Sequence, residues 1–80
     1  MPTVHEEEGC KFRINTHDHQ PAHVHVYVGD GVIQIYLDDH GTIKQQWHVS
    51  ASEAKKAQRL ALANQGKLMK AWVSLHGKTE

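Results

Sequence analysis

Residues 23–28 alternate strictly between valine and a polar or aromatic side chain, and this alternation constrains the fold more than any other feature. Side chains at positions i and i+2 of a β-strand point to the same face. Val24 and Val26 would therefore face one side of a sheet, whereas His23 and His25 would face the other. The segment predicts a strand with an apolar face turned to a core and a second face lined by imidazoles.

Two further runs alternate in the same way, residues 10–15 and residues 32–37. A glycine at the first position of a two-residue turn favours a type II′ hairpin, so residues 29–30 are expected to connect two antiparallel strands. The expected register pairs Tyr27 with Val32, His25 with Gln34, and His23 with Tyr36. The strand before this hairpin would add Lys11 and Arg13 to the histidine face.

Shorter segments complete the first part of the chain. We expect a short edge strand that begins at residues 3–5, a polar loop at 16–22, a turn at 38–41, and a short irregular strand at 42–48. A capping box follows, because the Ser50 hydroxyl can accept from the Glu53 amide while the Glu53 carboxylate returns the bond. A helix is expected to about residue 63, and Asn64 precedes a second helical stretch through His76.

These elements define an α+β fold in one small domain, residues 1–80. We expect an antiparallel β-meander of three to four strands over residues 1–48. A helical region over residues 50–76, either one bent helix or two helices, would pack on one sheet face. A chain of 80 residues buries a small core, so a dimer or a heteromeric complex is expected. Trp47 and Trp72 are interpreted as anchors of the core or of an interface.

Composition excludes several classes of protein. Nine acidic and nine basic side chains cancel, so bulk charge does not predict nucleic-acid binding. The single cysteine, Cys10, excludes an internal disulfide framework and fits a reducing compartment. No apolar run is long enough to span a bilayer, and the first residues show no signal-peptide pattern. We therefore expect a cytoplasmic protein without a membrane partner.

Four of the eight histidines lie between residues 17 and 25, which marks a candidate site. Histidine titrates near neutral pH and suits proton transfer, metal ligation or phosphate contact. Cross-strand neighbours have Cβ atoms roughly 4.5–5.5 Å apart, so the side chains of one sheet face could act on one small substrate. The expected open face carries Lys11, Arg13, His23, His25, Tyr27, Gln34 and Tyr36, with His17, Asp18 and His19 at its rim.

Three interpretations of this face remain open. Three imidazoles, from His19, His23 and His25, could hold zinc together with a water molecule. Alternatively, one imidazole could take the proton from a ribose 2′-hydroxyl while Lys11 or Arg13 stabilises the charge on the phosphorus, without a metal. In the third interpretation the face is a polar surface or a partner interface without chemistry.

Three segments resemble the small bacterial proteins of domain of unknown function 4160: residues 1–4, 18–26 and 68–72. The signature of that family is Asp-His-x-Pro-Pro-His-Val-His-Val, and here Ala22 replaces the second proline. The signature positions are Asp18, His19, His23 and His25. The resemblance implies a protein often encoded beside a partner of domain of unknown function 2442. This arrangement is similar to a type II toxin–antitoxin pair, with this family as the toxin.

Together, the pattern and the resemblance predict the toxin component of a bacterial type II toxin–antitoxin module that acts on RNA. The expected activity is that of a metal-independent endoribonuclease. The candidate catalytic residues are His19, His23, His25, Lys11, Arg13 and Tyr36. No cofactor is expected, with zinc on His19, His23 and His25 as the alternative. The expected partners are a cognate antitoxin and RNA. The alternative function is a non-catalytic metal-binding or protein-interaction module.

Overall fold

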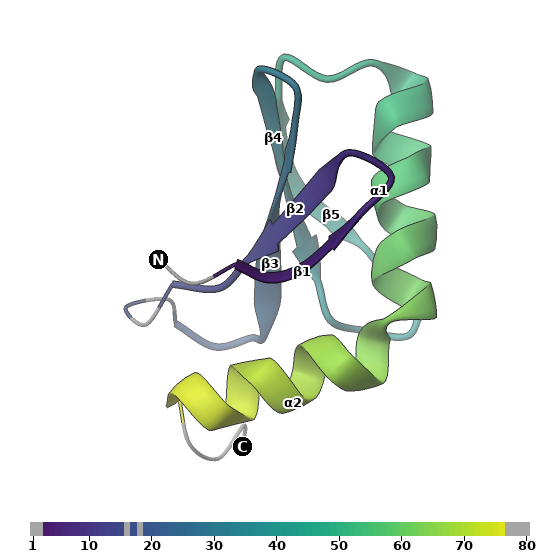
Figure 1. The fold of residues 1–80 in the computed structure, drawn as a ribbon. Coiled ribbons are helices and arrows are strands. Elements are labelled where there is room, and N and C mark those ends of the chain that lie inside the picture. The colour runs from purple at the N-terminus through teal and green to yellow at the C-terminus, as the bar shows by residue number, and fades with distance from the viewer. Residues whose placement is uncertain (1–2, 16, 18, 77–80) are drawn as a thin grey trace.

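The fold is an antiparallel sheet followed by two helices, as a computed structural model of the chain shows (Figure 1). The structure describes residues 3–15, 17 and 19–76. The strands are β1 (Thr3–Glu7), β2 (Cys10–Arg13), β3 (His23–Val28), β4 (Gly31–Tyr36) and β5 (Ile43–Trp47). The helices are α1 (Ala51–Ala63) and α2 (Gln65–His76). The α+β class and the meander are confirmed.

The expected number of three to four strands was wrong, because the sheet has five strands in the order β1-β2-β3-β4-β5. Both edge strands are irregular, which weakens their sequence pattern. The register of β1 shifts between Thr3 and His5, and that of the β4–β5 pair shifts between Gln34 and Ile35. A bulge adds a residue to one strand and breaks strict alternation.

The central register is confirmed at every predicted pair. Tyr27 pairs with Val32, His25 with Gln34, and His23 with Tyr36. Strand β2 pairs Lys11 with Tyr27 and Arg13 with His25. Residues 29–30 form the turn, and Gly29 adopts a φ of 56°, which glycine tolerates without a steric penalty.

The core lies between the apolar face of the sheet and the helices. It contains alternate residues of the central strands, with Phe12, Val24, Val26, Ile33 and Ile35 fully buried. Helix α1 contributes small side chains and Leu60, so that it packs close to the sheet. Cys10 belongs to this core, and burial raises the pKa of its thiol, which makes it a structural residue rather than a reactive one.

The two helices take different places. Helix α1 begins with the predicted capping box, in which Ser50 Oγ accepts from the Glu53 amide at 3.1 Å and Glu53 Oε1 accepts from the Ser50 amide at 2.8 Å. In Figure 1, α1 lies along one sheet face, whereas α2 crosses the end of the sheet where β3 begins. Helix α2 still adds Leu68 and Trp72 to the core that α1 covers, so the expected packing on one face holds for α1 and only in part for α2.

The position of α2 is fixed by polar contacts around Asn64. The Asn64 side chain donates to the Leu60 carbonyl at 2.8 Å and to Glu7 Oε1 at 3.1 Å, so it closes α1 and ties the helix junction to β1. One turn later, Lys67 Nζ donates to His5 Nδ1 at 2.8 Å. These contacts hold the first turn of α2 against the edge of the sheet. None of the helices in the described ranges is long and apolar enough to cross a membrane.

Candidate functional site

The face of the sheet opposite α1 carries two cross-strand rows of polar and aromatic side chains. Antiparallel partners point to the same face, so the strand register defines each row. The first row is Arg13, His25, Gln34 and Gln45, and the second row is Lys11, Tyr27, Val32 and Trp47. We call these eight residues the open face. They come from four neighbouring strands, β2 to β5.

Cationic and aromatic groups lie side by side on the open face. The Arg13 guanidinium carbon lies 5.1 Å from the centre of the Tyr27 ring, within the range of a cation–π contact. Lys11 is exposed beside Tyr27, and Arg13, His25 and Tyr27 are half-buried. The chain as a whole is neutral, but β2 places both of its cations on this one surface.

Trp47 was missed as a site residue by sequence reasoning. It was expected in a core or an interface, yet its relative exposure is 44% and it pairs with Val32 on the open face. The irregular β5 segment obscured the alternation that would have placed it there. Trp72, by contrast, is fully buried and confirms the expectation of a core anchor.

The expectation that His23 projects from an open face was wrong. His23 has a relative exposure of only 4%, and its ring centre lies 5.5 Å from that of Trp72. Its Nδ1 lies 2.9 Å from the Pro21 carbonyl oxygen, and since a carbonyl can only accept, Nδ1–H is the donor. Helix α2 crosses the end of the sheet where β3 begins (Figure 1). Its Trp72 packs beside His23, the first residue of β3, and both are buried. His23 is thus removed from solvent.

The aromatic contacts continue from His23 in two directions. On the sheet, its ring centre lies 5.6 Å from that of His25 and 6.3 Å from that of Tyr36. On α2, the rings of Trp72 and His76 stack with their centres 3.9 Å apart. His23 therefore connects the open face to the buried side of α2. His23 thus lies beside His25 but is covered, whereas His25 is half-buried on the open face.

The loop histidines do not complete a metal site in the part of the chain that the structure describes. His17 and His19 are exposed on the loop, and Asp18 lies outside the described residues. Within residues 3–15, 17 and 19–76, no group of three or more His, Cys, Asp or Glu side chains could hold a metal ion. His19, His23 and His25 thus form no such three-ligand group among the described residues, and zinc on this set stays a prediction.

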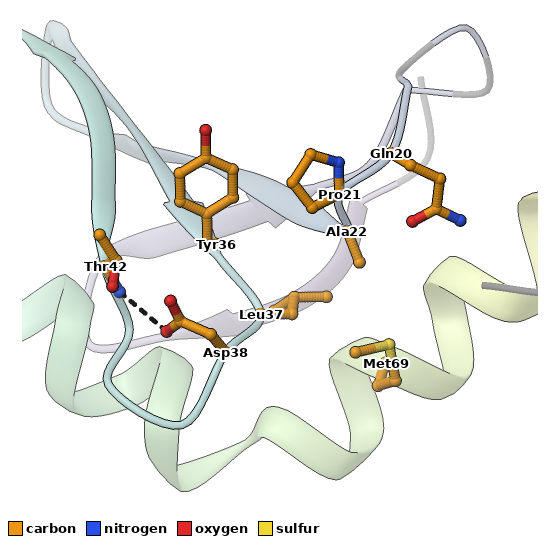
Figure 2. A pocket seen from close by; sticks show the side chains of 8 residues that line it. All are labelled: Gln20, Pro21, Ala22, Tyr36, Leu37, Asp38, Thr42 and Met69. Carbon is orange, nitrogen blue, oxygen red and sulfur yellow. Dashed lines mark hydrogen bonds between the residues drawn. The ribbon is translucent and has the colours of Figure 1, made fainter. Parts of the chain in front are cut away.

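Tyr36 lines a cavity of about 470 Å³ at the end of the sheet. Figure 2 shows it between residues 20–22 on one side and Asp38 and Thr42 on the other, with Met69 of α2 below. The Gln20–Pro21 peptide bond in this loop is cis. Tyr36 thus faces this cavity, although it shares the polar side of β4 with Gln34.

Asp38 closes the predicted turn at 38–41. Its Oδ1 accepts from the backbone amides of His40 at 3.0 Å and Thr42 at 3.1 Å. Hydrogen bonds from the Thr42 side chain, the Thr42 amide and the following turn lower the pKa of Asp38 from 3.8 to about 2. The carboxylate therefore stays ionised at any physiological pH.

Comparison with known proteins gives one match. The family model of the domain of unknown function DUF4160 matches residues 9–73, which include β2 to β5, α1 and most of α2. No curated protein and no solved structure matches the chain at a significant level.

Proposed function

The chain belongs to the DUF4160 family, and we propose that it is the RNA-acting toxin component of a bacterial type II toxin–antitoxin module. The open face would bind single-stranded RNA. The observation that carries this proposal is the row in which Lys11 lies in line with two aromatic rings, Tyr27 and Trp47, across four strands. A second cation, Arg13, comes from the neighbouring row and lies over the Tyr27 ring. The cognate antitoxin would be a second protein that binds this chain.

The chemistry of single-stranded RNA fits this surface. Proteins bind single strands with a cationic surface that follows the phosphates and with aromatic rings on which bases stack. Lys11 supplies an exposed charge, and Trp47 an exposed indole on the edge strand. A surface of this kind binds single strands with little dependence on the RNA sequence, because every base has a π-face that can stack on an aromatic ring.

Cleavage without a metal would use His25 as the base. Arg13 is the direct cross-strand neighbour of His25, so a phosphate held by Arg13 would place its ribose near the imidazole. His25 would take the proton from the 2′-hydroxyl, and the 2′-oxygen would attack phosphorus. Arg13 and Lys11 would stabilise the charge on the phosphorane. His19, one of the exposed loop histidines, would protonate the leaving 5′-oxygen.

Binding of a fluorescein-labelled single-stranded RNA, followed by anisotropy, tests the proposal. Trp47→Ala should weaken binding roughly tenfold or more, since one base–aromatic stack contributes about 1–3 kcal/mol. Lys11→Ala should weaken binding and reduce the slope of log K against log salt by about 0.7. Lys55→Ala is the matched control, because Lys55 is an exposed cation on α1, away from the open face. Equal affinity in all three variants would contradict the proposal.

A further inference from the structure

The cavity at the end of the sheet combines apolar walls with one fixed negative charge. Pro21, Leu37 and Met69 supply apolar surface from the loop, the end of β4 and α2, and Tyr36 supplies an aromatic ring (Figure 2). Among the residues that the structure describes, Asp38 is the one charged residue in the lining. A pocket of this composition favours a ligand with an apolar stem and a positively charged end.

The Asp38 carboxylate has no cationic partner among the residues that the structure describes. The ion pairs found there join His5 to Glu7 and Arg59 to Glu8, away from this turn. Backbone amides of the turn hold Oδ1 in place, so the carboxylate is oriented before any ligand arrives. Such a preorganised anion needs no rearrangement to receive a cation.

We propose that this cavity binds the side chain of an arginine presented by a partner protein. The guanidinium would pair with the Asp38 carboxylate and lie near the Tyr36 ring, while the methylene stem would pack against Leu37 and Met69. Arginine fits better than lysine because its planar, weakly hydrated head stacks on aromatic rings. Arginine binding here does not require RNA binding at the open face, since the cavity lining and the open face have no residue in common.

Two small probes test the inference, with chemical shifts of the ¹⁵N-labelled protein as the readout. N-acetyl-arginine methylamide should bind with a dissociation constant of about a millimolar, as expected for a ligand of this size. N-acetyl-citrulline methylamide has nearly the same shape without the charge and should bind at least tenfold more weakly. The largest shifts should occur at residues 36–42 and at Met69, and not at Lys11 or Trp47.

Asp38→Asn and Asp39→Asn form a matched pair of variants. Asparagine at position 38 keeps an oxygen that can accept the turn hydrogen bonds, whereas Asp39 is an exposed neighbour that does not line the cavity. Arginine binding should fall at least tenfold in Asp38→Asn and stay unchanged in Asp39→Asn, while RNA binding should be unchanged in both. Absence of binding, equal binding of both probes, or equal loss in both variants would overturn the inference. None of these outcomes depends on whether the open face binds RNA.

Discussion

His23 Nδ1 lies 2.9 Å from the carbonyl oxygen of Pro21, and the buried His23 ring packs beside Trp72. His25, two residues further on, is half-buried on the open face. The two histidines of the His-Val-His segment therefore have different roles. His23 holds the loop and α2 against the start of β3, and His25 faces the surface where RNA would bind.

The first prediction concerns the stability of the two histidine variants. His23→Ala should lower the free energy of unfolding by about 2–3 kcal/mol, because it removes a buried ring and leaves the Pro21 carbonyl without its donor. His25→Ala should cost less than about 1 kcal/mol. Urea unfolding followed by circular dichroism measures both values. Equal losses would mean that the two rings are buried alike.

The second prediction concerns the close approach of β4 to the segment after β5. A Cβ atom on Gly31 would lie 2.7 Å from the Trp47 carbonyl oxygen and would also meet the backbone of His48. Gly31→Ala should therefore destabilise the domain by about 1–3 kcal/mol. Gly66→Ala is the control, because a Cβ atom there would meet nothing within 4 Å and alanine favours helix. The control should raise the melting temperature. If both substitutions changed the melting temperature in the same direction, the close approach of Gly31 to the segment after β5 would be refuted.

The third prediction concerns acid stability. The folded-state pKa of Asp38 is lowered from 3.8 to about 2, so its stabilising contribution is present above pH 3.8 and is lost as the pH falls towards about 2. The difference in melting temperature between the parent and Asp38→Ala should therefore shrink over this interval. A difference that stays constant from neutral pH down to about pH 2 would show that the turn does not depend on the ionised carboxylate.

The fourth prediction concerns metal. Treatment with a chelator should leave both the melting temperature and any RNA cleavage unchanged, because no three His, Cys, Asp or Glu side chains among the described residues form a group that could hold a metal ion. Lys11 and Arg13 would also repel a cation bound on their own face. Elemental analysis of protein purified without a metal-affinity column measures bound zinc. About one zinc per chain, released by His19→Ala, would instead support the metal interpretation.

Much of the fold could be predicted from the sequence, since alternation in the central strands fixes which side chains share a face. The pairing of His25 with Gln34 follows from that pattern and the turn at 29–30, and the pattern also predicts Arg13 on the same face. The burial of His23 does not follow, because it depends on where α2 crosses the sheet. That crossing is set by contacts between distant residues, such as Asn64 with Glu7.

The site was less predictable than the fold for the same reason. Trp47 lies on an irregular edge strand, and its exposure depends on pairing with Val32 rather than on local pattern. Tyr36 shares a register position with His23, yet the loop at 20–22 and Met69 turn its surroundings into a cavity. Local spacing cannot indicate which segments of the chain enclose a side chain.

Induction of the parent and of His25→Ala in bacterial cells, with sequencing of the ends of cellular RNA, tests the central claim most directly. RNA from cells that express the parent should be cut at single-stranded positions, and growth should stop. Cells that express His25→Ala at the same level should keep intact RNA, while the purified variant still binds the labelled oligonucleotide within about threefold of the parent. Intact RNA with both proteins, or equal cleavage by both, would contradict the claim that the open face cleaves RNA.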